Sequence, residues 1–200
     1  MVLCLILFGL VSYGYIERQA VPQNADGHTS EPVEKKLLTT PIDRIVALRF
    51  KDATGCVVIS QGDVWKVEGV PEARRVDEDA MTELLSAIEA AREIRIFDSD
   101  PPDLAQYGLA TPSLIIGIQR RGEGEFHNLF LGEKNPIGST VYAKWAQSSQ
   151  VLMIGTYFET LVRMMVQRIR EGQKNPLPPS DQCRDLPPTR AGRSLSVRPL

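Results

Sequence analysis

The chain has few of the residues that build metal centres and nucleophilic sites. Its 200 residues include three cysteines and two histidines, and no C-x-x-C spacing occurs. Zinc sites usually need such paired ligands, so we predict no metal. Cys4 lies in an apolar run, Cys56 in a predicted strand and Cys183 in a Pro-rich tail. The odd count and the setting of Cys183 argue against a disulfide between Cys56 and Cys183.

The chain also lacks an excess of charge of either sign. Lys and Arg total 23 and Asp and Glu total 25, which gives a net charge of −2. We predict no nucleic-acid partner, because proteins that bind nucleic acid gather basic residues on one face. Neither G-x-S-x-G nor G-x-x-x-x-G-K-[ST] is present, and these are local signatures of hydrolases and of nucleotide binding. We therefore predict no catalytic residues, no cofactor and no enzymatic activity.

An uncharged apolar run over residues 2–16 opens the chain. It is shorter than the roughly 17–25 residues that usually span the hydrocarbon core. It lacks the basic start and the small-residue cleavage site of a secretory signal. A buried helix or strand is the alternative, but it fits poorly because linker-like sequence follows. We predict a membrane anchor over residues 1–17, with Tyr13 and Tyr15 at the interface, and a flexible tether over residues 18–40.

Apolar patterns predict an α+β domain over residues 41–170. We expect a mainly antiparallel sheet, or sheets, of about seven to eight short strands with two packed helices, preceded by the N-terminal membrane helix. Arg44 and Arg49 fall on the wetter side of the first strand, and Trp65 fills the core. The predicted strands cover residues 42–50, 56–60, 64–67, 94–97, 113–120, 125–131, 140–145 and 151–154.

Two stretches carry apolar residues at helical spacing. Asp77 is a good N-cap for the first helix, whose apolar stripe includes Leu84 and Ile88. Thr156 and Glu159 have the spacing of a capping box at the start of the second helix. We expect both helices to pack on the sheet through their apolar stripes.

Turn-forming residues are densest after Asp100. We predict that Asp100 caps a short helix with Pro101 at its first position. Gly108 should end that helix in the left-handed conformation, with Leu104 and Leu109 in contact. The segment is therefore predicted to be a corner that leads into the next strand.

The last part of the chain, residues 171–200, has many prolines and few large apolar residues. A segment of this composition buries too little apolar surface to offset the entropy of ordering. We predict a disordered tail.

Two motifs give the chain a resemblance to a known family. They read L-x-x-Y-G-L-x-x-P and L-x-x-G-x-x-x-P-x-G-x-x-x-Y-A, and a Gly–Trp hairpin and a Pro–Asp helix entry precede them. Over about residues 37–170 the chain resembles the bacterial family called domain of unknown function 4340. We predict that the motif residues are structural: Trp65, Tyr107, Gly108, Leu109, Pro112, Gly132, Pro136, Gly138 and Tyr142.

The resemblance implies an envelope protein that accompanies ABC-type transport systems, with a membrane helix, a tether and an α+β unit. The family has no assigned catalytic residues. We therefore expect a non-catalytic domain, anchored in the membrane on the extracytoplasmic side. Its expected partner is a protein, and the resemblance points to a component of an ABC-type transporter. The alternative is an enzyme or small-ligand-binding domain with a non-local site around His127, Lys134 and Tyr142.

Overall fold

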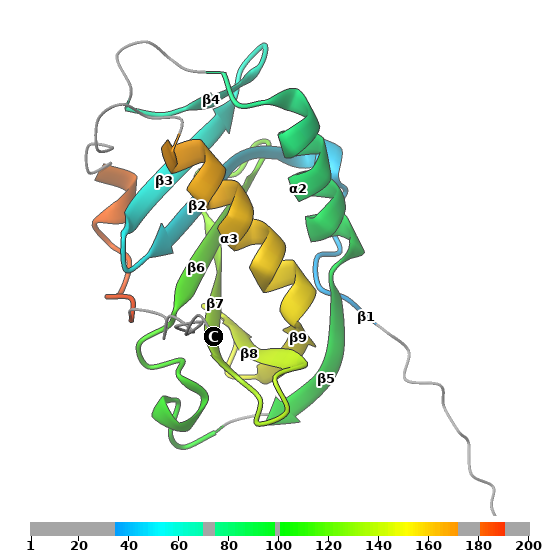
Figure 1. Cartoon of the computed structure of the whole chain (residues 1–200), viewed down its shortest axis with the longest axis vertical. Coiled ribbons are helices and arrows are strands. Elements are labelled where there is room, and N and C mark those ends of the chain that lie inside the picture. Colours follow the sequence, from blue (N-terminus) through cyan, green and yellow to red (C-terminus); the bar gives the residue numbers. More distant parts are fainter. Residues whose placement is uncertain (1–34, 70–74, 99–100, 172–180, 191–200) are drawn as a thin grey trace, which may run out of the picture. The chain divides into compact units, whose positions relative to one another are not determined.

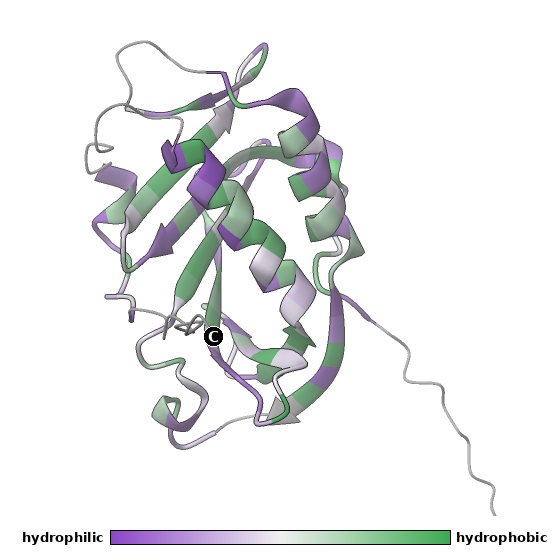
Figure 2. Cartoon of the chain, in the orientation of Figure 1, coloured by the Kyte–Doolittle hydropathy of each residue, from purple (hydrophilic) through white to green (hydrophobic). Residues whose placement is uncertain are grey.

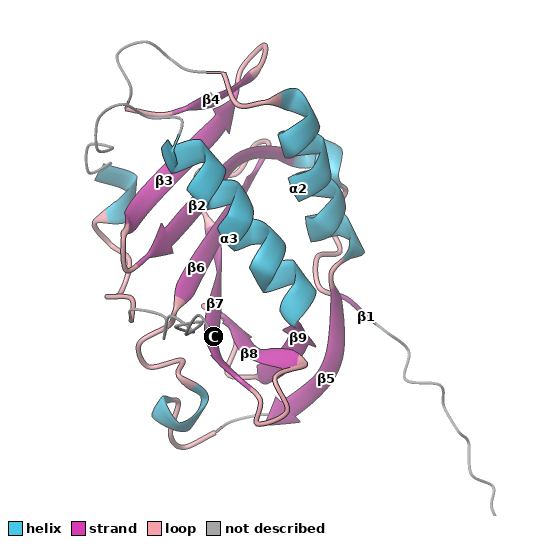
Figure 3. Ribbon diagram, viewed as in Figure 1, coloured by secondary structure: helices cyan, strands magenta, loops and turns pink. Residues whose placement is uncertain are grey.

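One antiparallel sheet organises the chain (Figures 1 and 3). The computed structural model describes residues 35–69, 75–98, 101–171 and 181–190. Within them the sheet has nine strands in the order β1-β5-β9-β8-β7-β6-β2-β3-β4. The strands are β1 (Lys35–Lys36), β2 (Ile45–Asp52), β3 (Gly55–Gln61), β4 (Trp65–Val67), β5 (Arg92–Asp98), β6 (Leu114–Arg120), β7 (His127–Lys134), β8 (Thr140–Trp145) and β9 (Val151–Gly155).

Helices α2 (Glu78–Ala90) and α3 (Thr156–Glu171) cover one face of this sheet, which we call the helix face (Figure 3). Asp77 caps α2 as predicted, because its Oδ1 accepts a hydrogen bond from the Ala80 N–H at 2.9 Å. Buried hydrophobic residues of the strands and of both helices form one cluster between the two layers, and Figure 2 shows where hydrophobic residues occur along these elements. The α+β class and the two helices are therefore confirmed. The main core includes Leu48, Phe50, Ile59, Leu84, Ile88, Ile116, Leu131 and Val162.

The domain begins earlier than the predicted boundary at residue 41. β1 pairs with β5, and the adjoining Leu37 and Leu38 are buried in the core, although the sequence placed them in the tether. This accounts for a ninth strand. The predicted anchor and most of the predicted tether lie outside the described residues. No helix in the described part of the chain is long and apolar enough to cross a membrane.

The second face of the sheet is covered as well, and we call it the strap face. Neighbouring side chains of a strand point to opposite faces, yet Leu48, Arg49 and Phe50 are all buried. Around Arg49 the cover is residues 181–190, here named the strap, which includes the short helix η3 (Asp181–Cys183). Arg49 therefore does not lie on a wet side of its strand. The prediction of disorder for the C-terminal tail is also wrong for the strap, because this segment is fixed against the sheet.

Candidate functional site

The first family motif forms a corner around the short helix η2 (Ala105–Tyr107). Gly108 ends it with a φ of 68°, in the left-handed region as predicted. The Leu109 N–H donates to the Leu104 carbonyl oxygen at 3.0 Å, which closes the turn. The helix start differs from the prediction: Asp103 Oδ1 accepts the hydrogen bond from the Ala105 N–H at 2.7 Å. Asp100, the expected cap, lies outside the described residues.

The two motifs pack against each other through their glycines. A Cβ placed on Gly132 would lie 2.0 Å from the Tyr107 carbonyl oxygen. A Cβ on Gly108 would lie 2.6 Å from Cγ of Glu133. Both distances are far below van der Waals contact, so the two backbones can meet only where both residues are glycine. The ring centroids of Tyr107 and Tyr142 are 5.1 Å apart and close the same junction.

The remaining motif residues also have structural places. Pro136 and Gly138 lie in the turn between β7 and β8, where the Gly138 N–H donates to the Asn135 carbonyl oxygen at 2.9 Å and Gly138 has a φ of 80°. Trp65 packs half-buried against the main core. The Pro112 carbonyl oxygen accepts a hydrogen bond from the Arg190 N–H at 3.0 Å, so the corner also receives the end of the strap.

The three residues of the alternative site do not meet. His127 and Lys134 stand at opposite ends of β7, about 20 Å apart at the usual rise of a strand. Lys134 forms an ion pair with Glu159 at 3.7 Å, and Tyr142 packs with Tyr107 and Phe130 in a small apolar cluster. His127 lines a cavity that the described residues form.

That cavity holds about 280 Å³ and is lined by side chains that include Glu93, Arg120, His127 and Trp145. Glu123 stands beside it, with His127 Nε2 2.7 Å from Glu123 Oε2 and Arg120 Nη1 3.4 Å from Oε1. The hydrogen bond from His127, together with the attraction of Arg120, lowers the pKa of Glu123 below its ordinary value. The cavity thus combines an imidazole, a guanidinium, a carboxylate and an aromatic ring.

A larger cleft of about 560 Å³ lies between the start of α2 and the end of α3. Its lining includes Arg75, Arg168, Asp77 and Glu83 above apolar residues such as Met165. Because both signs of charge occur at its rim, the cleft favours no single class of ligand. Among the described residues no group of three or more His, Cys, Asp or Glu side chains is placed to hold a metal ion.

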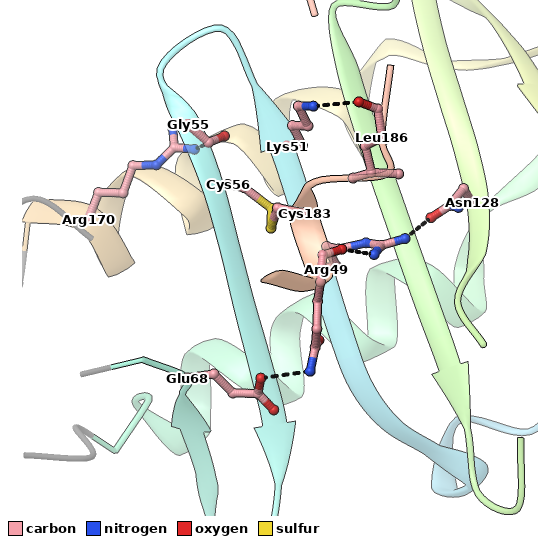
Figure 4. The surroundings of a disulfide bond; sticks show 10 residues. Arg49, Lys51, Gly55, Cys56, Glu68, Asn128, Arg170, Cys183 and Leu186 are labelled. Atoms are coloured by element: carbon pink, nitrogen blue, oxygen red, sulfur yellow. Dashed lines mark hydrogen bonds between the residues drawn. A yellow bond between two sulfur atoms is a disulfide. The ribbon is translucent and has the colours of Figure 1, made fainter. Parts of the chain in front are cut away.

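The strap is joined to the sheet by a disulfide between Cys56 and Cys183 (Figure 4). The expectation against this bond is wrong, because the segment around Cys183 is not a free tail. Figure 4 shows Arg49 and Lys51 reaching from β2 toward the strap. Lys51 Nζ donates to the Leu186 carbonyl oxygen at 2.8 Å, and Arg49 donates to that of Gln182.

Arg49 is the charged centre of the strap face and is only 7% exposed. Its Nη2 donates to Asn128 Oδ1 at 2.7 Å, and its guanidinium carbon lies 4.2 Å from the Phe126 ring centroid. Its Nε has no hydrogen-bond partner among the described residues. Burial lowers the pKa of Arg49, and attraction to Asp185 of the strap acts in the opposite direction. A Cβ on Gly117 would lie 3.0 Å from that Nε, so glycine leaves room for the guanidinium.

The turn between β2 and β3 is also held from the helix face. Arg170, at the end of α3, contacts Asp52 Oδ2 at 2.7 Å and the Gly55 carbonyl oxygen at 3.0 Å, and it also bonds Thr54. Burial alone would raise the pKa of Asp52, but hydrogen bonds from Arg170 and Thr54 and the attraction of Arg170 lower it. One turn is thus fixed by an ion pair on one face and, at Cys56, by a disulfide on the other (Figure 4).

Glu159 has a different role from the one predicted. Its carboxylate is buried, bonds Arg163 Nε at 2.9 Å and faces Lys134. The Thr156 N–H instead donates to the Ser139 carbonyl oxygen at 3.2 Å. The expected capping box is therefore wrong, because the carboxylate joins α3 to β7 rather than to its own first turn.

Comparison with known proteins gives one family. A family model described as Domain of unknown function (DUF4340) matches residues 65–173. Neither the curated proteins nor the solved structures contain a significant match. The matched stretch holds both motifs, the corner and α3, whereas β2, β3 and the strap fall outside it.

Proposed function

The chain belongs to the DUF4340 family, and from that premise we propose that it is a non-catalytic, protein-binding domain that works outside the cytoplasm. The observation that carries this proposal is the Cys56–Cys183 disulfide. Disulfides form and persist in oxidising compartments and are rare in the cytosol. Residues 2–16 would anchor the domain in the membrane, and a component of an ABC-type transport system is the partner class that the family resemblance implies.

The placing of the family motifs supports a role without chemistry. Gly108 and Gly132 allow two backbones to meet, and Tyr107 and Tyr142 fill the space beside them. Each of these residues has a packing or backbone role, so the most specific part of the sequence is accounted for by the fold.

Two exposed apolar side chains supply a surface for a protein partner. Ile137 is 86% exposed in the β7–β8 turn, and Tyr157 is 74% exposed in the first turn of α3. The two elements are adjacent, because Ser139 accepts hydrogen bonds from Thr156. Exposed apolar groups that lie together are typical of interaction sites.

The proposal is tested in intact cells that make the full chain. Cys56 and Cys183 should resist a thiol-alkylating reagent until a reductant is added, and the chain should sediment with membranes. Crosslinking should join the chain to a membrane protein, and replacing Ile137 and Tyr157 with Ser should weaken that crosslink. Ile94→Ser, at another exposed apolar position, is the matched control. Free cysteines in a soluble chain without a crosslinked partner would contradict the proposal.

A second candidate function is the binding of a small polar ligand at the His127 cavity. The observation that favours it is the set of Arg120, His127, Trp145 and Glu93 around one space of about 280 Å³, since pockets of this kind combine an aromatic surface with a few polar groups. A thermal-shift screen of small polar molecules tests it. A true ligand should stabilise the wild-type chain and lose that effect in His127→Gln, while Lys134→Gln keeps it.

A further inference from the structure

Apart from its disulfide, the strap is held mostly through its main chain. Arg49 and Lys51 both donate to strap carbonyl oxygens, those of Gln182 and Leu186. At its end the Arg190 N–H donates to the corner. Every residue has a carbonyl oxygen and nearly every residue an N–H, so these contacts recognise an extended chain more than a particular sequence.

Few strap side chains are committed to the sheet. Within residues 181–190 only Cys183 and Leu186 are buried. Gln182 donates to Glu68 at 3.1 Å and Arg190 donates to Glu133 at 2.6 Å, and both hydrogen bonds are exposed to solvent. Exposed polar pairs of this kind add little to binding. The disulfide therefore supplies most of what keeps the strap in place, because it holds a weakly bound segment at high local concentration.

The surface beneath the strap is ready for an extended segment. Val58 pairs with Arg49 and Ile115 pairs with Lys51, so both lie on the strap face, and both are buried. Arg49 stands between them and is oriented by Asn128 and Phe126, which belong to the domain and not to the strap. These two contacts with Arg49 do not involve the strap.

We propose that the strap face is a docking surface for an extended segment of a partner protein, and that the Cys56–Cys183 disulfide decides whether the strap or the partner occupies it. The fitting partner segment carries two apolar side chains three residues apart, matching Cys183 and Leu186. It also carries an acidic residue at the position of Asp185, whose charge attracts Arg49. The inference rests on the proposed protein-binding function and adds a second contact surface, besides that of Ile137 and Tyr157, and what opens it.

Opening requires a two-electron exchange with a protein dithiol. A thiolate of the dithiol attacks one sulfur of the disulfide and forms a mixed disulfide, which releases the other cysteine as a thiolate that takes up a proton. The second thiol of the donor then attacks the mixed bond. The donor leaves as a disulfide, and Cys56 and Cys183 are left as two thiols that no longer hold the strap.

The test uses the full chain and a fluorescent peptide of residues 181–190 that carries Cys183→Val, which keeps an apolar side chain at the first anchor and cannot form a disulfide. The opened chain carries Cys183→Ser and Leu186→Asp, so that its own strap lacks both anchors. Fluorescence anisotropy should show that the peptide binds the opened chain and not the oxidised wild-type chain. Lys51→Gln in the opened chain should weaken binding about tenfold, because one charge-assisted hydrogen bond is lost. Lys66→Gln, on the neighbouring edge strand, should leave binding unchanged.

Two further peptides separate main-chain recognition from sequence recognition. A peptide that is alanine at all positions except the two apolar anchors and the acidic residue should bind with comparable affinity. A peptide that lacks the anchors should not bind. The inference is overturned if the opened chain is folded by circular dichroism and binds no peptide, or if the oxidised wild-type chain binds equally well. This assay is done with purified protein, so its result is independent of the thiol state in cells that tests the proposed function.

Discussion

On the helix face, helices α2 and α3, of 13 and 16 residues, pack against the sheet. On the strap face, the strap, residues 181–190, is joined to β2 and β3. The helices bury apolar stripes. The strap buries only Cys183 and Leu186 and otherwise relies on a disulfide and on hydrogen bonds from Arg49 and Lys51.

This difference means that one cover is intrinsic and the other is conditional. Apolar burial acts in any redox environment, so the helix face should be closed wherever the chain folds. A disulfide holds two segments together only while it is oxidised. The strap therefore stays on its face only where the surroundings keep the bond oxidised. A domain built in this way can keep its core while one face changes its cover.

The largest expected effect comes from removing a buried side chain beneath the helices. Phe50→Ala should lower the free energy of unfolding by about 3–5 kcal/mol, because Phe50 is fully buried beneath the helices and its removal leaves a cavity. Urea unfolding should give the same loss with and without a reductant. Ile137→Ala, at an exposed position, should change stability by less than about 0.5 kcal/mol. If the loss of stability in Phe50→Ala changed with the reductant, the cover of the helix face would also depend on the redox state, and the two faces would not differ in this way.

The next effect comes from removing the strap's covalent bond. Cys183→Ser should cost about 2–4 kcal/mol under oxidising conditions, because the disulfide closes a loop with a sequence separation of 127 and constrains the unfolded chain. Urea unfolding of the wild type in a reductant should match the variant, which should itself be insensitive to the reductant. Cys4→Ser, which leaves the disulfide intact, is the control. If the free energy of unfolding of Cys183→Ser equalled that of the wild type, the strap would be held without the disulfide.

The comparison also separates what the sequence can predict from what it cannot. The helix face rests on local periodicity, and Asp77 with the apolar spacing of α2 was enough to place that helix. Gly108 was likewise predictable, because a helix that ends at glycine has a known local geometry. Such features depend on residues within one or two turns of each other.

The strap face rests on residues more than a hundred positions apart. Arg49 meets Gln182, and Cys56 meets Cys183, and no local pattern links them. One signal was present: β2 and β6 read as nearly continuous apolar runs, I-V-A-L and L-I-I-G-I. Strands buried on both faces have this character, whereas a strand with one wet face alternates. That run indicates that something covers the second face but does not identify the strap as the cover.

A smaller effect tests whether the helix face also depends on charge. Asp52→Asn should cost about 1.5–3 kcal/mol at neutral pH, because Arg170 loses a charge-assisted partner. The pKa of Asp52 is lowered in the folded chain. The stabilisation is therefore fully present above the ordinary carboxyl pKa of about 4, and it is lost as the pH falls through the folded value.

Urea unfolding of the wild type and of Asp52→Asn over a series of pH values measures this dependence. The difference between the two chains should be constant near neutral pH and should shrink in acid. Asp43→Asn, at an exposed position, should differ little from the wild type near neutral pH. A difference for Asp52→Asn that persists unchanged in strong acid would contradict the assigned ion pair with Arg170.

The smallest effect concerns the start of α2, where the intrinsic cover of the helix face begins. Asp77→Ala should cost about 1 kcal/mol, because the Ala80 N–H loses its acceptor at 2.9 Å. Asp77→Asn keeps an acceptor oxygen and should restore most of that loss, which separates the hydrogen bond from the charge. Urea unfolding with and without a reductant should give the same values, since this cap stabilises the helix face alone. If the stability lost in Asp77→Ala were larger when the disulfide is reduced, the helices and the strap would be energetically coupled. In that case the strap could not leave the sheet without loosening the core.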